Sequence, residues 1–394
     1  MKRMLFAGAA AIAVSLLPVT GHAEGTIKVG VILPYSGQFA DAAKQVDEGI
    51  KLYMKQHGDT VAGKKIEIIR KDTGGSAPPV AKRLAEELVV RDKVDILAGW
   101  LLTPNAIAGC GVSAEAKKVS VIMNAATSII VDKSPYCTRA AFTLSMVTET
   151  LGNWAAKNGI KKAYTMVSDY APGHDSEAGF IKGFKAGGGE IVGSVRMAVA
   201  NPDFSAYVQR AKDLNPEAIF VFIPGGAQPA AIGKAFAERG IDTKKVKIMS
   251  TQELGDDSAL KNMGDTALGI ITASPYDHNL KTKANETFVA AYKKEFGADN
   301  PNFFSAGGYD GMTLIYEGLK KTKGDADAEK LIGAMKGTKW VSPRGPMMID
   351  PETRDAVENI YIQKVEKVGG KLTNVVIGTV QNVKDPVHEA MKKK

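Results

Sequence analysis

The stretch that decides the fold is Ile27-Lys28-Val29-Gly30-Val31-Ile32-Leu33, which ends at Pro34. Apolar and β-branched residues dominate it, as expected of a strand that is buried on both faces of a parallel sheet. An amphipathic helix is predicted next, over 41–56, because apolar residues recur at helical spacing from Ala43 to Met54. A buried strand followed by such a helix is the opening unit of an α/β fold.

The same alternation continues for most of the chain. Further strands are predicted over 66–70, 94–98, 119–123, 163–167, 190–195, 218–223 and 246–249, with helices between most of them. Alternating strands and helices imply right-handed crossovers and doubly wound parallel sheets. The chain has 394 residues, more than the roughly 250–300 at which single cores usually divide, so two lobes are expected.

Two places indicate that the chain passes from one lobe to the other. The alternation restarts after 142–145, and a second crossing is expected at 273–276, before two long helices near 283–296 and 306–321. The last stretch changes character. Residues 340–350, 360–365 and 375–381 predict a small β-rich end.

The N-terminus has the pattern of an export signal. Met1-Lys2-Arg3 precedes an apolar run from Met4 to Leu17, and Gly21 and Ala23 are the small residues that a signal peptidase reads. A membrane anchor is the alternative, but the run is shorter than the roughly 20 residues that a spanning helix needs. We expect residues 1–23 to be a signal peptide and the mature protein to be periplasmic, with no lipid-site Cys near the cut.

The charge indicates a solvated surface and no nucleic-acid partner. Loss of Lys2 and Arg3 would lower the formal net charge from +8 to +6, and acidic residues are interspersed among the basic ones along the chain. Cys110 and Cys137 are the only cysteines. An oxidising compartment favours a disulfide between them, with two buried free thiols as the alternative.

A search for catalytic and metal motifs finds none. The five His residues are scattered, the two Cys lack CxxC spacing, and neither GxSxG nor GxGxxG occurs. One near miss is 58–65, which almost spells a phosphate loop but has Lys65 where Ser or Thr is needed and leads into a strand. It is interpreted as a turn. We therefore expect no catalytic residues, no cofactor and no metal.

The candidate binding residues lie in loops at the carboxyl ends of strands, where open α/β sheets bind ligands. Thr103 is expected to cap a helix that starts at Pro104, which would aim free backbone N–H groups at an anion. Each side chain also has a purely structural interpretation, but together they indicate a cleft between the lobes. The expected ligand-binding residues are Tyr35, Ser36, Trp100, Leu101, Leu102, Thr103, Asn124, Ala125, Ala126, Thr127, Tyr170, Pro172, Gly225, Gly226, Gln252, Glu253 and Tyr276.

Four segments carry a family resemblance. Residues 27–37, 163–173, 305–312 and 342–350, in this order and spacing, resemble the periplasmic solute receptors of branched-chain amino-acid-type ABC transporters, which have the type I periplasmic binding fold. The resemblance implies a third crossing near Asp350, capture of a solute by lobe closure, and docking on a membrane permease. With it, the N-terminal lobe is expected to be 24–143 plus 276–349 and the C-terminal lobe 144–275 plus 350–394.

The sequence differs from the family's amino-acid receptors at positions that are expected to contact the ligand. Leu101-Leu102-Thr103 stands where they usually have Ser-Ser, and Pro172 precedes Gly173 where they usually have Tyr. The family's small residues plus Thr are present as Ala125-Ala126-Thr127, so the resemblance implies a carboxylate cradle. An ammonium or a hydroxyl group would be held by Glu253, or by Gln252 if the register differs. Trp100, Leu101, Tyr170 and Pro172 would widen the pocket and make it more apolar, which suits a flat ring.

The leading hypothesis is therefore a monomeric ABC-transport receptor, without enzymatic activity, that captures a small carboxylate. An aromatic acid is favoured over a branched-chain amino acid or amide. Two alternatives stay open at this point: an exported enzyme on a similar two-lobed scaffold, and a sensory module that presents the loaded form to a signalling receptor.

Overall fold

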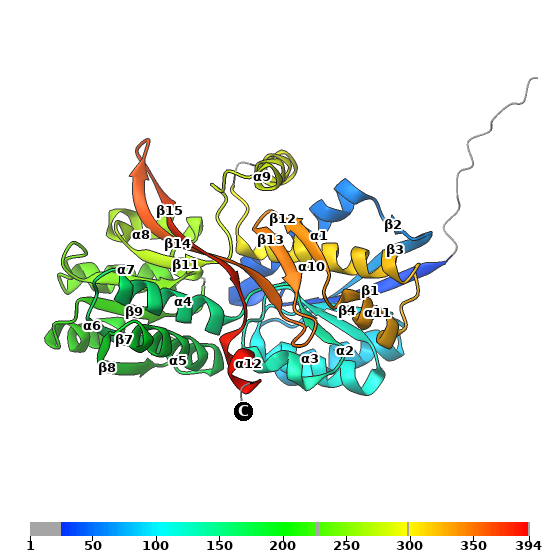
Figure 1. The fold of residues 1–394 in the computed structure, drawn as a ribbon, viewed down its shortest axis with the longest axis horizontal. Coiled ribbons are helices and arrows are strands. Elements are labelled where there is room, and N and C mark those ends of the chain that lie inside the picture. Colours follow the sequence, from blue (N-terminus) through cyan, green and yellow to red (C-terminus); the bar gives the residue numbers. More distant parts are fainter. Residues whose placement is uncertain (1–24, 226–227, 298, 393–394) are drawn as a thin grey trace, which may run out of the picture.

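The computed structural model describes residues 25–225, 228–297 and 299–392. The expected signal peptide, 1–23, lies outside these residues. Within them, no helix combines the length and the apolar character that crossing a membrane requires. Two lobes lie side by side, each built on its own sheet (Figure 1).

The first lobe contains a six-stranded sheet in the order β2-β3-β1-β4-β5-β6. All neighbours are parallel except the short β2–β3 hairpin. Residues 58–65, whose sequence is close to that of a phosphate loop, contain this hairpin. The prediction of a turn is confirmed, with Gly63 at φ 75°. The strands are β1 (Thr26–Leu33), β2 (Thr60–Val61), β3 (Lys64–Asp72), β4 (Ile96–Gly99), β5 (Val119–Ile122) and β6 (Cys137–Arg139).

Helices cover both faces of this sheet because its strands are apolar on both sides. Val29 and Val31 of β1 pack under α1, α10 and α11, while Ile32 packs on the other side under α2 and α3. The helices are α1 (Ala40–His57), α2 (Pro78–Val90), α3 (Thr103–Ala116), α10 (Phe303–Lys321) and α11 (Ala328–Met335), with short 3-10 turns η1 (Gly37–Phe39) and η2 (Ser128–Lys133).

The second lobe contains a larger, mixed sheet. Its parallel part has the order β11-β10-β9-β7-β8, with β7 (Lys162–Ser168), β8 (Glu190–Met197), β9 (Ala218–Phe222), β10 (Lys247–Thr251) and β11 (Ile271–Ser274). Val167 packs under α4 and α5, whereas Met166 packs on the opposite face with α6, α7 and α8. These helices are α4 (Leu144–Lys157), α5 (Ala171–Ala186), α6 (Phe204–Asp213), α7 (Gln228–Glu238) and α8 (Asp257–Met263), with 3-10 turns η3 (Gln252–Leu254) and η4 (Gly264–Ala267).

The β-rich end predicted from the sequence is part of this second sheet. The strands β12 (Lys339–Ser342), β13 (Gly345–Ile349), β14 (Ala356–Val368) and β15 (Lys371–Val383) are all antiparallel to their neighbours, and β14 joins β11. The sheet is therefore mixed, not wholly parallel. A last helix, α12 (Pro386–Met391), ends the described chain between the two lobes (Figure 1).

The chain passes between the lobes three times. It leaves β6 for α4 through 140–143, leaves β11 for α10 through 275–302, which includes α9 (Lys283–Phe296), and leaves α11 for β14 through 336–355. Buried charges tie these passages together. Arg344 Nε donates to Asp310 Oδ2 of α10 at 2.8 Å, and its Nη1 donates to Glu358 Oε2 of β14 at 2.8 Å. Its Nη2 donates to the carbonyl of Ala140.

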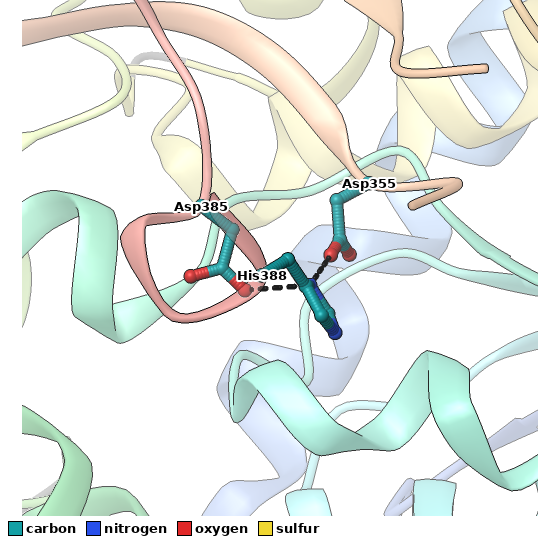
Figure 2. A group of neighbouring side chains, drawn as sticks. All are labelled: Asp355, Asp385 and His388. Carbon is teal, nitrogen blue, oxygen red and sulfur yellow. Dashed lines mark ion pairs between the residues drawn. The ribbon is translucent and has the colours of Figure 1, made fainter. Parts of the chain in front are cut away.

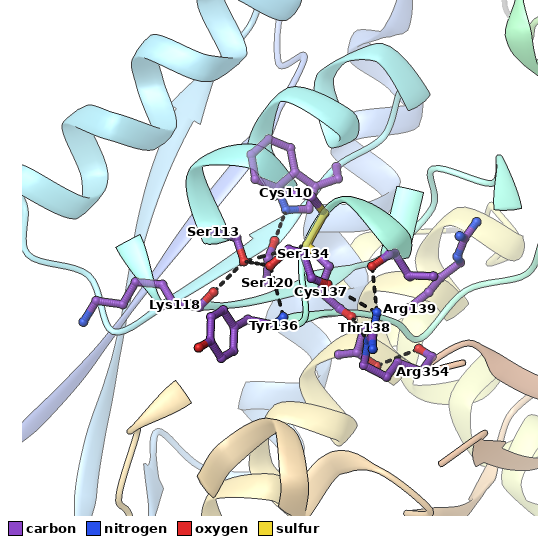
Figure 3. Close-up of a disulfide and its surroundings, with 12 residues drawn as sticks. Cys110, Ser113, Lys118, Ser120, Ser134, Tyr136, Cys137, Thr138, Arg139 and Arg354 are labelled. Carbon is purple, nitrogen blue, oxygen red and sulfur yellow. Dashed lines mark hydrogen bonds between the residues drawn. A yellow bond between two sulfur atoms is a disulfide. The ribbon is translucent and has the colours of Figure 1, made fainter. Parts of the chain in front are cut away.

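The predicted Cys110–Cys137 disulfide is confirmed (Figure 3). It joins α3 to β6, with the two Cα atoms 6.0 Å apart, so it lies within the first lobe. Both cysteines are fully buried. The bond therefore closes a loop across one sheet edge and does not span the two lobes.

Candidate binding cleft

A cleft of about 600 Å³ lies between the two lobes, at the carboxyl ends of their central strands. In the first sheet β1 lies between β3 and β4, and in the second sheet β7 lies between β8 and β9. The strand order therefore changes direction at β1 and at β7. The loops after β1 and β4, and those after β7 and β9, diverge at these points and leave a crevice. Of the expected residues, those that line the cleft are Leu101, Leu102, Thr103, Asn124, Ala126, Tyr170, Pro172, Gly225 and Glu253.

The first lobe contributes the start of α3 to the lining of the cleft. Leu102 occupies the N-cap position and has no side-chain capping bond, whereas Thr103 is the first helical residue, so the expectation that Thr103 caps the helix is wrong. Its hydroxyl lies 3.1 Å from the hydroxyl of Thr127 and pairs with that residue. The first-turn N–H groups still have no acceptor within the helix, and they carry its positive dipole end.

The second lobe contributes Glu253, in η3, to the lining of the cleft. Burial raises the pKa of its carboxyl to about 7, partly opposed by the hydroxyl of Thr251. Its Oε2 atom is buried and has no hydrogen-bond partner. Asp256, not Glu253, caps the following helix, because its Oδ1 accepts from the backbone N–H of Ser258 at 3.0 Å. Glu253 is therefore a buried acid with unused hydrogen-bonding capacity.

Aromatic side chains also line the cleft. Tyr170 and Phe222 come from the second lobe, with ring centroids 6.2 Å apart. Phe142 lies in the first passage between the lobes and Phe303 begins α10, and the two rings form an edge-to-face pair with centroids 6.0 Å apart. An apolar lining with polar groups from both lobes suits a flat aromatic ligand that carries polar substituents.

Several expected residues lie elsewhere. Trp100 is fully buried behind the cleft, where its Nε1 donates to Ser120 Oγ at 2.8 Å and its ring contacts Gly109, at which a Cβ atom would lie 2.1 Å from the ring. Its left-handed φ of 64° begins a turn that the sequence pattern does not reveal. The aromatic wall expected at Trp100 is therefore a core side chain.

The remaining expected residues also lie outside the lining. Tyr35 donates its hydroxyl to Asp47 at 3.2 Å, and the backbone of exposed Ser36 donates to Asp72 at 3.2 Å. Ala125 and Thr127 are buried beside the cleft wall. Gln252 and Tyr276 line a separate cavity of about 320 Å³. Gly226 lies outside the described residues.

Sequence reasoning missed part of the lining. Phe222 is the last residue of the buried strand β9, three positions before the expected binding residue Gly225. Phe142 lies in the first passage between the lobes, and Phe303 and Phe304 begin α10 directly after the second, so the rule about carboxyl ends of strands could not find them. Phe39 and Gln45 come from the start of the first helical segment.

Two mixed sheets, three passages and a cleft lined from both sides define a two-lobed solute receptor. The chain belongs to the periplasmic binding protein family, whose model matches residues 26–371. It is 39% identical over 380 residues to "Leu/Ile/Val-binding protein homolog 6" of Brucella melitensis, which covers 95% of this chain and 97% of that protein. The fold and the family make it an ABC transporter solute-binding protein, of a kind that is not enzymatic.

Two solved structures are similar over nearly the whole chain. One is a solute-binding protein of an ABC transporter from Rhodopseudomonas palustris BisB5 in complex with 3,4-dihydroxybenzoic acid, with 53% identity, a TM-score of 0.88, and coverage of 92% of this chain and 99% of that one. The other, from Rhodopseudomonas palustris HaA2 in complex with p-hydroxybenzoic acid, has 40% identity, a TM-score of 0.89, and coverage of 94% and 100%.

Proposed function

We propose that this chain is the receptor of an ABC importer for a hydroxylated aromatic carboxylate such as 4-hydroxybenzoate. The observation that carries the proposal is the lining of the cleft, which combines a helix start from one lobe, a buried acid from the other, and aromatic side chains. The relatives that bind dihydroxy- and hydroxybenzoic acid support the same ligand class.

The proposed pose follows from the charges. The carboxylate lies on the first turn of α3, where backbone N–H groups and the Thr103 hydroxyl donate to it. The ring lies between Leu101 and the aromatic side chains. The ring hydroxyl reaches Glu253, whose Oε2 has no other partner. Because the two polar ends lie on different lobes, a ligand of this length favours closure of the lobes around it.

The cellular setting is also a proposal. The signal peptide over 1–23 sends the chain to the periplasm, where the disulfide forms and the protein works as a monomer that docks on a membrane permease. The lobes that close are 24–143 plus 276–349 and 144–275 plus 350–394. The passages through 140–143 and 275–302 support the first two boundaries, whereas β12 and β13, at the end of 276–349, pair with the sheet of the second lobe.

A branched-chain amino acid is the second candidate, because the Brucella relative is named for leucine, isoleucine and valine. In this case Glu253 would hold the α-ammonium group. Thermal unfolding of the mature protein with each ligand separates the two proposals. A saturating ligand at about 100 times its dissociation constant should add roughly 2.7 kcal/mol of stability. A rise in Tm with 4-hydroxybenzoate but not with leucine supports the aromatic receptor, and the reverse result overturns it.

A further inference from the structure

Three buried side chains converge near the C-terminal end of the described chain, outside the cleft (Figure 2). Asp355 directly precedes β14, Asp385 is the N-cap of α12, and His388 lies within α12. The three residues are 1%, 3% and 6% exposed. His388 Nδ1 lies 2.9 Å from Asp355 Oδ2 and 3.0 Å from Asp385 Oδ2. The scattered His residues of the sequence gave no sign of this cluster, because its members meet only in the fold.

The outer atoms of the three side chains are held by other groups. Asp355 Oδ1 accepts from Arg139 Nε at 2.9 Å, and Asp385 Oδ1 accepts from the backbone N–H of Val387 at 3.1 Å. His388 Nε2 faces both carboxylate oxygens of Asp132 at 3.2 Å. A carboxylate on the far ring nitrogen is the usual orienting partner of a metal-binding histidine.

The three inner atoms face one another without a satisfactory partner. Their separations are those of ion pairs, but none of the three atoms has a hydrogen bond of acceptable direction. If Nε2 donates its proton to Asp132, the Nδ1 lone pair points at two negative oxygens. A proton on Nδ1 could serve only one of these oxygens, whereas a divalent cation would serve all three atoms.

We propose that Asp355, Asp385 and His388 bind a divalent transition-metal ion, with Zn²⁺ as the best match. One imidazole and two carboxylates are ligands that zinc accepts, and a water molecule would complete a tetrahedral site. Zinc bonds of about 2.0–2.2 Å at tetrahedral angles place ligand atoms roughly 3.3–3.6 Å apart. The two nitrogen–oxygen separations of 2.9 Å and 3.0 Å would therefore lengthen by roughly half an ångström.

The surrounding charges fit such an ion. Asp132 and Asp175 add two more carboxylates near the cluster, and the guanidinium groups of Arg139 and Arg354 oppose them. With a neutral imidazole, these groups leave an excess of two negative charges, which a divalent cation would balance. Without metal, the carboxylates of Asp355 and Asp385 raise the pKa of His388 to about 10, and the cluster is an ion-paired triad.

The ion would fasten the C-terminal helix to the third passage between the lobes. Asp385 and His388 belong to the segment around α12, and Asp355 precedes the strand that joins the second sheet. Asp132 of η2 and Arg139 of β6 connect the same cluster to the first lobe. The site is structural, and its occupancy is independent of the ligand in the cleft.

The test is zinc binding by the full mature protein after dialysis against a chelator. Calorimetric titration with ZnCl₂ should show one site per chain, and Tm should rise with zinc. We expect His388→Ala and Asp385→Asn each to weaken zinc binding at least tenfold. The matched control is His174→Ala, because His174 also contacts a carboxylate, Asp169 at 2.7 Å, but on the surface. It should bind zinc as the parent does.

X-ray absorption of the zinc-loaded parent protein keeps the proposal testable even where a variant fails to fold. The proposal expects nitrogen and oxygen neighbours at about 2.0–2.2 Å, one of them an imidazole. No zinc uptake by the parent, uptake that His388→Ala leaves unchanged, or a zinc ion without an imidazole neighbour would each overturn the site and leave the ion-paired triad as its description.

Discussion

Two glutamates show how differently the cleft and the passages between the lobes use a buried acid. Burial raises the pKa of both Glu253 and Glu358 to about 7, in Glu358 against the opposing pull of Arg344. Glu358 receives an ion pair from Arg344 at 2.8 Å, whereas no cationic side chain contributes to the pKa shift of Glu253 and its Oε2 has no partner. The passages use their polar groups to fix the fold. Glu253 lines the cleft and keeps an oxygen without a partner.

The largest effect is expected for Glu358, the buried acid that is paired with a cation. Arg344→Met leaves Asp310 and Glu358 buried without their cation, which should cost about 3–5 kcal/mol of unfolding free energy. Chemical denaturation measures the loss. Arg83→Met, which removes a surface pair with Glu87, is the control and should cost well under about 1 kcal/mol. Equal losses in the two variants would contradict the role given to Arg344.

Removal of the disulfide should have a slightly smaller effect on stability. The bond joins residues 27 positions apart, for which the chain-entropy model gives about 3.5 kcal/mol. The double variant Cys110→Ser, Cys137→Ser should therefore unfold at lower denaturant concentration. Its affinity for 4-hydroxybenzoate should stay the same, because neither cysteine lines the cleft. A large loss of affinity together with unchanged stability would contradict the expectation that the disulfide stabilises the fold without affecting the cleft.

A smaller effect is expected at the start of α3, where we propose that the ligand carboxylate binds. Thr103→Ala removes a hydroxyl that we assign to the ligand carboxylate, and should weaken binding by about 1–2 kcal/mol. Isothermal titration with 4-hydroxybenzoate measures it. Thr313→Ala, at a threonine outside the cleft lining whose hydroxyl donates to the carbonyl of Tyr309, is the matched control. If the two variants bind equally well, the carboxylate lies elsewhere.

The smallest effect is a pH dependence at Glu253. Because the pKa of Glu253 is about 7, its carboxyl loses its proton between about pH 6 and about pH 8. An ionised carboxylate accepts more strongly from a ring hydroxyl, and benzoate, which lacks the hydroxyl, leaves it buried and unpaired. The preference for 4-hydroxybenzoate over benzoate should therefore rise several-fold with pH.

Glu253→Gln gives the control for this titration. The amide keeps the shape of the side chain but has no proton to lose in this range, so the preference should no longer change with pH. A preference that is flat with pH in the parent protein, or that rises equally in the variant, would show that the ring hydroxyl does not meet Glu253.

The sequence predicted most of the fold because its signals are local. The apolar pattern around Val29 predicted a buried strand, which the structure has. The helix over 283–296 was predicted with the bounds that the structure has. The site was predicted only in part. Thr103 and Glu253 follow strand ends and were predicted in the lining, whereas Phe303 is the first residue of α10, and the position of this helix depends on packing between distant segments. No local pattern marks such a residue.

Trp100 illustrates the opposite error. An aromatic residue directly after a strand was expected in the cleft, but its left-handed backbone and the small Gly109 opposite let the ring enter the core of the first lobe. Trp100 and Gly109 are nine positions apart in sequence, and only the packing of α3 on the sheet brings them together.

A crystal structure of the mature protein with 4-hydroxybenzoate tests the central claim most directly. The account predicts closed lobes, the carboxylate on the first turn of α3 beside Thr103, and the ring hydroxyl within hydrogen-bond distance of Glu253. A ligand bound outside the cleft, or one whose carboxylate lies against Glu253 while its hydroxyl faces α3, would contradict it.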